Sequence, residues 1–308
     1  MRTITIGTRG SSLSLCQTQI IQVWLEEHFA QHQFVVKTIK AKADHNPEVP
    51  LVAIGGEGIF VKELEASLLK GEIDLAVHSM KDLPLQIPAG IVLAAITERE
   101  EARDAFMSRT GQALDQLPAG SRIGTSSLRR KSQLLHLRRD IEVVEIRGNV
   151  DTRVRKLDEG RYDAIVLAAC GLIRLGLEDR ITQYLSLDQM LPEPGQGALG
   201  VEARAGDEEI LELLKVLDDP ITRACVEAER AFLRALGGGC RVPIAAYAQI
   251  ANGTLALDGA VVAPDGTRLL RDRSTGPLES PESLGEALAN RLISQGAKEL
   301  LKMERPAS

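Results

Sequence analysis

Cys240 is the residue whose neighbours most clearly indicate chemistry. It follows three glycines and precedes Arg241 in the stretch GGGCRVP at 237–243. Glycines give the thiol little side-chain cover, and an adjacent cation favours the thiolate, which is the nucleophilic form of cysteine. The sequence therefore predicts a reactive nucleophile at Cys240. The other cysteines are expected to be free thiols with structural roles: Cys16, Cys170 and Cys225.

Four further stretches place hydroxyl and cationic side chains directly after strand-like runs. In α/β proteins the loops at the carboxyl ends of strands bind ligands, and a helix that begins there favours anions. Hydroxyls, backbone N–H groups and forked guanidinium groups together suit a carboxylate or a phosphate. The stretches are TRGSSL at 8–13, HSMKDLP at 78–84, GTSSLRR at 124–130 and RGNVDTR at 147–153.

Positive charge is concentrated around the last two of these stretches. Segment 121–156 has ten Arg/Lys and four Asp/Glu, in a chain whose formal net charge is −6. Arg129 and Arg130 open a helix-like segment, where each cation opposes the helix dipole at a cost of about 0.3–1 kcal/mol unless an anion compensates. This pattern predicts a local anion site, although charge alone also fits a solvated basic helix face.

Composition disfavours several other classes of protein. No metal site is predicted, because the cysteines form no CxxC and His78 has no second ligand at suitable spacing; His78 is expected to be a hydrogen-bonded structural residue. No GxxxxGK[ST] loop for nucleotide phosphates is present. The longest apolar run, 165–170, is far shorter than a membrane span, and no apolar signal segment is evident, so a cytoplasmic protein is expected.

Strand-like and helix-like segments alternate through the first two-thirds of the chain. Amphipathic helices are expected at about 13–29 and 60–69, with Ser11 and Ser12 as candidate caps. Such alternation predicts parallel α/β sheets, with enough strands for two domains. The strand-like runs are 3–6, 35–39, 74–77, 91–96, 122–124, 142–146, 164–168 and 198–202.

The last third has a different pattern. A helix is expected from Pro220 to about Leu236, and another from about 281 to 301. Asn-Gly at 252–253 and Pro-Asp-Gly at 264–266 separate alternating runs and are strong hairpin signals. The sequence therefore predicts a small α+β domain with a three-stranded antiparallel sheet, formed by 244–250, 254–262 and 267–271.

Together these motifs resemble the hydroxymethylbilane synthase family, also called the porphobilinogen deaminases. The resemblance covers essentially the whole chain, and the order of the motifs makes it specific. Besides HSMKDLP, GTSSLRR, RGNVDTR and GGGCRVP, it includes LAACGLIRLG at 167–176 and PGQGALG at 194–200.

The resemblance implies a three-domain α/β architecture. The first two domains are expected to be similar to periplasmic solute-binding proteins, with a cleft between them, and the third is the small α+β domain that carries the cysteine loop. The expected boundaries are 1–98 with 198–217 for domain 1, 99–197 for domain 2 and 218–308 for domain 3. A monomer is expected, because the family is typically monomeric.

The resemblance also implies the reaction. The family cysteine, matched by Cys240, holds a dipyrromethane cofactor through a thioether. Four porphobilinogen molecules are joined to this primer head to tail, each losing ammonia, and water releases the linear tetrapyrrole hydroxymethylbilane. The expected cofactor-binding residues are Cys240, Lys81, Asp82, Ser11, Thr125, Ser127, Arg129, Arg130 and Arg147, and the expected substrate-binding residues are Arg9, Arg147, Arg153 and Arg174.

Asp82 matches the catalytic residue of the family. Coupling places positive charge on a pyrrole nitrogen, which a facing carboxylate stabilises while it moves protons. The pKa of Asp82 is expected to fall among the cations, which keeps the carboxylate ionised. The sequence departs from the family at Ala53 and Glu57, where lysines are usual, and at Ala43, where Gly is usual, so the charge of that loop is altered.

Two rival functions fit part of the sequence. A plain anion-binding protein on the solute-binding fold explains the arginines but gives Cys240 and Asp82 no role. A nucleic-acid-binding protein rests on the basic segment alone and predicts steeply salt-dependent binding. It also lacks stacking residues, because aromatics are only 3% of the chain.

Overall fold

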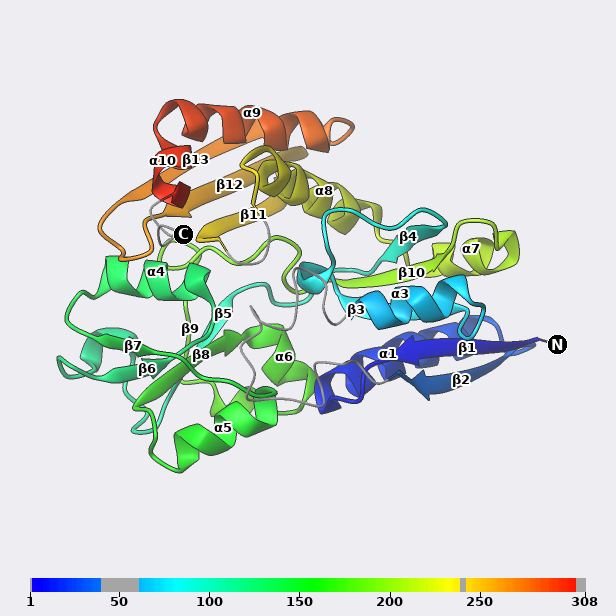
Figure 1. The fold of residues 1–308 in the computed structure, drawn as a ribbon, viewed down its shortest axis with the longest axis horizontal. Helices are drawn as coiled ribbons and strands as arrows, with labels where there is room; N and C mark the ends of the chain where they lie inside the picture. The colour runs from blue at the N-terminus through cyan, green and yellow to red at the C-terminus, as the bar shows by residue number, and fades with distance from the viewer. Residues whose placement is uncertain (1, 40–60, 239–241, 303–308) are drawn as a thin grey trace. The chain divides into compact units, whose positions relative to one another are not determined.

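The computed structural model describes residues 2–39, 61–238 and 242–302. The chain divides into two compact units. Unit 1 comprises Met1–Glu100 with Gly197–Arg223, and unit 2 comprises Glu101–Gln196 with Ala224–Ser308. The backbone therefore passes from one unit to the other three times, and Figure 1 follows its course by colour.

Unit 1 is built on a five-stranded mixed sheet with strand order β2-β1-β3-β10-β4. β1 is parallel to β2 and β3, whereas β10 is antiparallel to both β3 and β4. The expected parallel pairing therefore holds for β1, β2 and β3 but is wrong for β10. The strands are β1 (Thr3–Thr8), β2 (Gln33–Thr38), β3 (Leu75–Ser79), β4 (Ile91–Ile96) and β10 (Leu199–Arg204).

The antiparallel direction of β10 follows from how the chain returns to unit 1. The chain leaves the unit after Glu100, shortly beyond the end of β4, and re-enters it at Gly197, just before β10. Outgoing and returning segments are adjacent, since Glu100 N donates to Gly197 O at 3.3 Å. The strand that follows the return must therefore run opposite to the strand that preceded the departure.

Within the described part of unit 1, helices α1, α3 and α7 pack against the sheet. Ile21 and Leu25 of α1 are fully buried in a core with Ile4, Ile6 and Leu75. Leu64 and Leu68 of α3 pack in a second cluster, with Ile73 and Ala76. The helices are α1 (Ser12–His28), α3 (Lys62–Leu69) and α7 (Glu208–Leu214), with short 3-10 turns η2 (Met80–Asp82) and η5 (Lys215–Leu217).

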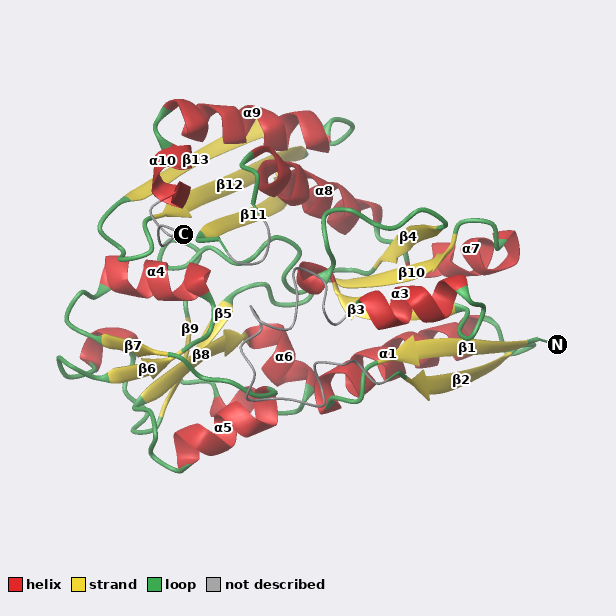
Figure 2. Ribbon diagram, in the orientation of Figure 1, coloured by secondary structure: helices red, strands yellow, loops and turns green. Residues whose placement is uncertain are grey.

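Unit 2 contains a second five-stranded mixed sheet, with strand order β7-β6-β8-β5-β9. β6 is parallel to β7 and β8, and β5 is antiparallel to β8 and β9. Figure 2 shows helices beside this sheet. Its elements are β5 (Asp104–Ser108), η3 (Leu114–Gln116), β6 (Arg122–Gly124), α4 (Leu128–Leu137), β7 (Glu142–Val144), α5 (Val150–Asp158), β8 (Ala164–Ala168), α6 (Ala169–Arg174), η4 (Glu178–Arg180) and β9 (Gln183–Tyr184).

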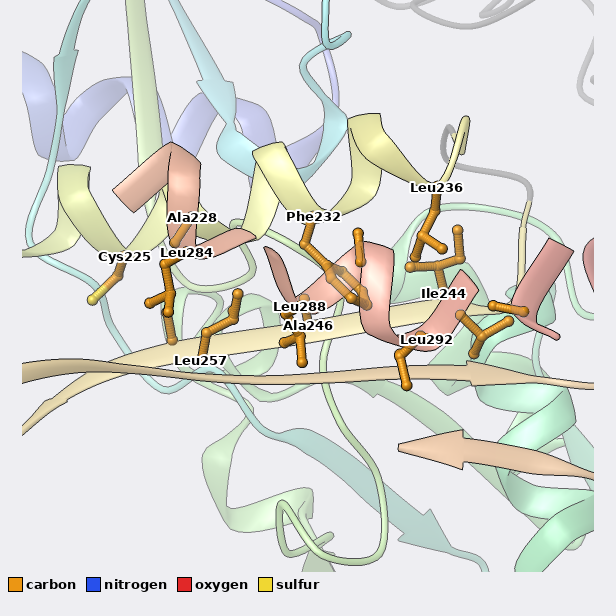
Figure 3. Close-up of a cluster of buried hydrophobic side chains, with 14 of the residues drawn as sticks. Cys225, Ala228, Phe232, Leu236, Ile244, Ala246, Leu257, Leu284, Leu288 and Leu292 are labelled. Carbon is orange, nitrogen blue, oxygen red and sulfur yellow. The ribbon is translucent and has the colours of Figure 1, made fainter. Parts of the chain in front are cut away.

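The C-terminal part of unit 2 forms a three-stranded antiparallel sheet with order β11-β12-β13. Phe232 and Leu288 fill the core between the sheet and two helices (Figure 3). They lie so close to Gly259 that a Cβ there would be 2.6 Å from the Phe232 ring. The elements are α8 (Pro220–Ala235), β11 (Ile244–Ala251), β12 (Thr254–Val262), β13 (Leu269–Gly276), α9 (Pro281–Ser294) and α10 (Ala297–Lys302).

These three sheets confirm the predicted fold class: two α/β sheets followed by a small antiparallel α+β part. The predicted final helix is interrupted at Gly296, whose φ of +98° is incompatible with helix. The three predicted domain boundaries stay a prediction. Within the described residues, no helix has the length and apolar character needed to cross a bilayer.

Candidate active site

Two loops of unit 1 lie at the same edge of its sheet. β1 and β3 are parallel neighbours, so the segments that follow them, which contain Arg9 and Lys81, emerge together. Ser11 caps α1 by accepting a hydrogen bond from Ser14 N at 3.2 Å. A hydrogen bond of 2.9 Å from Gln17 Nε2 to Ser79 Oγ joins α1 to the end of β3. Ser11, Arg9 and the Lys81-Asp82 pair are thus brought to one edge.

Asp82 is exposed, although the chain on either side of it is anchored by buried residues. It ends the 3-10 turn η2, whose first residue, Met80, is 1% exposed and donates its N–H to Ala198 O at 3.0 Å. Leu83, which follows Asp82, is also buried. Lys81 is half-buried. Because the residues on both sides are buried, the backbone at Asp82 is fixed while its side chain is exposed to solvent.

His78 lies behind this turn in the interior of unit 1. Its Nε2 is 3.1 Å from Glu202 Oε2, and both side chains are buried. Burial, followed by the negative charge of Glu202, raises the pKa of nearby Glu65, while His78 and Lys62 oppose the rise. No group of side chains in the described ranges is suited to hold a metal ion. His78 is therefore paired with a carboxylate in the core.

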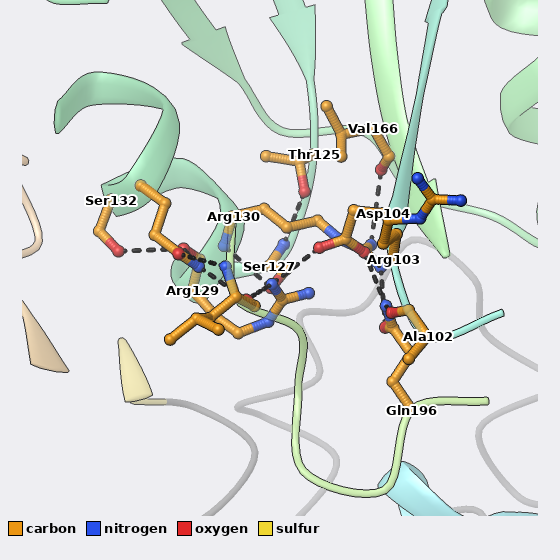
Figure 4. A network of polar contacts seen from close by, with 12 residues as sticks. Ala102, Arg103, Asp104, Thr125, Ser127, Arg129, Arg130, Ser132, Val166 and Gln196 are labelled. Atoms are coloured by element: carbon orange, nitrogen blue, oxygen red, sulfur yellow. Dashed lines mark hydrogen bonds and ion pairs between the residues drawn. The ribbon is translucent and has the colours of Figure 1, made fainter. Parts of the chain in front are cut away.

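In unit 2, Arg129 and Arg130 share one buried carboxylate. Arg130 Nε and Nη2 donate to Asp104 Oδ1 at 3.0 and 2.8 Å, and Arg129 Nη1 donates to Asp104 Oδ2 at 2.8 Å (Figure 4). Asp104 is 0% exposed, and the two arginines are 3% and 6% exposed. Although burial opposes it, the two guanidinium groups hold the pKa of Asp104 well below its ordinary value.

Arg129 has buried donors that no described protein group satisfies, although the negative charge of Glu193 acts on Arg130 in addition to that of Asp104. Two guanidinium groups share one carboxylate, and Nε and Nη2 of Arg129 are buried without a hydrogen-bond partner among the described residues. Leaving donors of a charged group unsatisfied in the interior is costly. The cluster is therefore electrostatically suited to an anionic ligand.

Hydroxyl groups flank the arginine pair. Ser127 caps α4 by accepting from Arg130 N at 3.4 Å, and the buried Thr125 accepts from Ser127 N through Oγ1 at 3.1 Å. Ser126 Oγ donates to Ile146 O, which ties this loop to the segment after β7. The loops that follow β6 and β7 are thus adjacent within unit 2.

The remaining predicted arginines of unit 2 differ in their surroundings. Arg147 forms an ion pair of 2.7 Å with Glu145, and Arg153 Nε donates to Gly148 O at 2.7 Å. Burial, and then the positive charge of Arg130, lower the pKa of Arg153 to about 10. Arg174 is half-buried at the end of α6. Of these three arginines, Arg153 is the one whose pKa responds to the charge of Arg130.

Some predicted features lie outside the described residues. These are Cys240, the predicted anchor, and the three positions that depart from the family pattern, Ala43, Ala53 and Glu57. In the described chain, α8 ends at Ala235 and is followed by Gly237 with φ of +71°, as the predicted glycine stop requires.

Sequence reasoning missed Asp104 and the role of Gln196. Asp104 lies on a strand that was not predicted, 25 residues before Arg129, and no local motif links the two. Gln196 lies in a recognised motif, PGQGALG, but its contact with Asp104 depends on the fold. One signal in the sequence indicates that a carboxylate partner exists, the excess of cations in segment 121–156. Cations that become buried require a carboxylate beside them.

Comparison with known proteins identifies the family. Models of the porphobilinogen deaminase dipyrromethane cofactor-binding domain and of the porphobilinogen deaminase C-terminal domain match residues 4–212 and 223–294. The chain is 51% identical over 304 residues to a porphobilinogen deaminase of Desulforudis audaxviator, covering 99% of this chain and 98% of that one. It is 50% identical to that of Synechococcus elongatus, covering 97% and 95%.

The structure is that of an α/β protein with a buried arginine cluster, in which two donors of Arg129 have no partner among the described residues. The sequence relationships give the particular group: the chain belongs to the porphobilinogen deaminase family. Among solved structures, the methionine-binding protein MetQ has a TM-score of 0.43 at 15% identity, covering 70% of this chain and 88% of that one.

Family membership confirms the predicted enzyme class, a transferase of tetrapyrrole biosynthesis, and the predicted dipyrromethane cofactor. The described residues fit such a cofactor in chemical type. Its pyrrole rings carry acetate and propionate groups, and Arg129 has two buried donors without a partner among the described residues. Charge-assisted hydrogen bonds from guanidinium to carboxylate are the strongest that this cluster can make.

Proposed function

We propose that this chain joins four porphobilinogen molecules head to tail onto a dipyrromethane held by Cys240, and then releases hydroxymethylbilane by hydrolysis. The observation that carries the proposal is the buried pair of Arg129 and Arg130, which share the Asp104 carboxylate while two donors of Arg129 have no partner among the described residues. Charged donors left unsatisfied in the interior suit a ligand with several carboxylates.

Cofactor binding is assigned to Arg129, Arg130 and Arg147, with the hydroxyls of Thr125 and Ser127, and to Ser11, Lys81 and Asp82. When bound, the dipyrromethane supplies a covalent primer for chain growth. The protein residues orient it by its carboxylates, because guanidinium groups bind carboxylates with defined geometry.

Substrate carboxylates are assigned to Arg9, Arg147, Arg153 and Arg174. Each porphobilinogen brings two carboxylates, so negative charge accumulates as the product grows. The lowered pKa of Arg153 supports this role, since it reflects burial first and then the positive charge of Arg130. An anion beside Arg153 relieves both costs.

Asp82 is assigned as the catalytic residue. Its exposed position at the end of η2 leaves its carboxylate accessible to a reacting group. A carboxylate stabilises positive charge that develops on a pyrrole nitrogen and exchanges a proton there. Coupling needs both actions, because one ring gains positive charge and must later lose a proton.

A cytoplasmic location and a monomeric state belong to the same proposal. The net charge of −6 supports solubility, and the family relatives match over nearly their full length. No nucleic acid and no membrane are included as partners. The principal alternative remains a protein that binds anions without transforming them.

Whole-protein mass spectrometry tests the proposal. Protein from cells that make porphobilinogen should exceed its sequence mass by two linked pyrrole units, and should convert porphobilinogen into the linear tetrapyrrole. Cys240→Ser should lose the added mass and the activity. Cys16→Ser, which changes a half-buried cysteine on α1, is the matched control and should retain both. An unmodified, inactive wild type would favour the anion-binding alternative.

A further inference from the structure

We propose that Asp104 is a positioning residue: it orients Arg129 and Arg130 so that the remaining donors of the two guanidinium groups bind the carboxylates of one pyrrole ligand. The inference rests on the proposed function for the identity of that ligand. It assigns to Asp104 a role beyond neutralising charge.

The contacts of Asp104 fix both guanidinium groups. Its two carboxylate oxygens are divided between them, with Oδ1 accepting two hydrogen bonds from Arg130 and Oδ2 accepting one from Arg129. Arg129 Nη1 also donates to Leu191 O at 2.6 Å. One nitrogen of Arg129 is therefore fully committed, and the buried Nε and Nη2 are the donors that remain.

The carboxylate is itself held in place. Gln196 Nε2 donates to Asp104 Oδ1 at 3.0 Å and to Ala102 O at 2.6 Å, and Gln196 Oε1 lies 3.4 Å from Arg130 Nη2. Gln196 is 0% exposed. Because one side chain contacts both the acid and the cation, the orientation of Asp104 and that of Arg130 are coupled.

The partner of Arg129 on the other side is equally fixed. Gln133 Oε1 accepts from Leu191 N at 2.8 Å, and Gln133 Nε2 donates to Leu191 O at 3.0 Å. This two-point contact fixes the peptide that receives Arg129 Nη1. A cluster that served only to neutralise charge would not need its acceptors fixed from several directions, whereas ligand binding by a bidentate group depends on orientation.

An electrostatic role and an orienting role for Asp104 predict opposite effects of Asp104→Asn on anion binding. Removal of the carboxylate raises the positive charge of the cluster, so a purely electrostatic role predicts tighter binding of an anion. Loss of orientation predicts weaker binding, because the guanidinium groups repel one another and are no longer held toward a common point. A purely structural role predicts lower stability with an unchanged response to anions.

The test uses the full chain carrying Cys240→Ser, with citrate as a tricarboxylate probe and thermal unfolding as the readout. We expect Asp104→Asn to weaken the citrate response at least tenfold in half-saturating concentration, and Asp104→Glu, which keeps the charge, to weaken it less. Asp258→Asn, which removes a partly buried carboxylate beside Arg271 and Arg273, is the control and should leave the response unchanged. An unchanged or stronger response in Asp104→Asn overturns the proposal.

Steady-state kinetics of the cofactor-loaded enzyme gives a second readout. Asp104→Asn should raise the KM for porphobilinogen by at least tenfold, with a smaller change in kcat. If Asp104→Asn does not fold, Gln196→Leu removes the support of Asp104 and should raise both KM and the citrate half-saturation about threefold; unchanged values overturn the proposal. A wild type that responds to citrate but never consumes porphobilinogen would contradict the proposed function and leave the role of Asp104 intact.

Discussion

Asp82 and Asp104 are two carboxylates near cationic motifs, and they are placed in opposite environments. Asp82 is exposed at the end of η2 in unit 1, whereas Asp104 is fully buried at the start of β5 in unit 2. Asp104 forms ion pairs with Arg129 and Arg130, at 2.8 Å to each.

The difference separates two uses of the same functional group. A carboxylate that exchanges protons with a substrate must be accessible, as Asp82 is. A carboxylate with a strongly lowered pKa and no exposed surface is a fixed negative charge and a hydrogen-bond acceptor, which describes Asp104. Under the two proposals, the same residue type acts on the substrate in one unit and on the protein in the other.

Asp82→Asn should have the largest effect on activity. Loss of a positioned acid–base group typically costs about 10²–10⁴-fold in rate. Because Asp82 is exposed, the free energy of unfolding should change by less than about 0.5 kcal/mol. Tetrapyrrole formation and urea unfolding measure the two quantities, and a stable variant with normal turnover would remove Asp82 from the reaction.

Asp104→Asn should affect stability more than activity, the reverse of Asp82→Asn. We expect a loss of about 3–5 kcal/mol in the free energy of unfolding of unit 2, as for other buried pairs that lose one partner. The lowered pKa of Asp104 means that its stabilisation is complete above the ordinary value of 3.8 and declines as pH falls through the lowered value. Unfolding curves of both proteins should therefore converge only in strong acid. Convergence between pH 5 and 7 would contradict this account.

Ser127→Ala and Ser11→Ala should cost about 1 kcal/mol each, because each serine caps a helix. Because both serines are also assigned to the cofactor, each substitution should change cofactor binding as well. Ser280, which makes no side-chain capping bond to α9, supplies the control: Ser280→Ala should change stability less. Equal losses in all three variants would show that the caps contribute nothing specific.

Glu65→Gln should have the smallest effect, and it should be stabilising. The pKa of Glu65 is raised from 4.5 by burial and by Glu202, so folding loses stability as pH rises from the ordinary value through the raised one. The glutamine variant does not titrate and avoids that loss. Its melting temperature should exceed that of the wild type at pH 7, with the gap narrowing toward pH 4; a gap that is constant with pH would refute the assignment.

The sequence predicted the fold wherever local signals were strong. The Asn-Gly turn at 252–253 and the glycines after α8 predicted the C-terminal hairpin and the helix end, since both depend on backbone conformations that few residues adopt. β5 and the two-residue β9 were missed because they are short and lack a clear alternation. The direction of β10 is set by the path of the chain between units, which no local pattern records.

The candidate site was predicted to a different degree. Loops after β1, β3, β6 and β7 were correctly expected to follow strands, and the hydroxyl and arginine motifs lie there. The partner of the arginines was not predictable, because Asp104 and Gln196 reach them across 25 and 66 residues of sequence. The residue types of the motifs predict the charge of the ligand that the site binds. Only the fold shows which of the arginines are already paired with a carboxylate of the protein.

The position of β10 has a consequence for synthesis on the ribosome. This strand lies between β3 and β4, yet it is translated about a hundred residues after β4. At about 5–20 residues per second, the nascent N-terminal sheet waits roughly 5–20 s for its internal member. The second sheet has all its strands by Tyr184, before β10 begins at Leu199. The first of the two five-stranded sheets to be started is therefore the last to receive all its strands, and β3 and β4 are both synthesised long before the strand that lies between them.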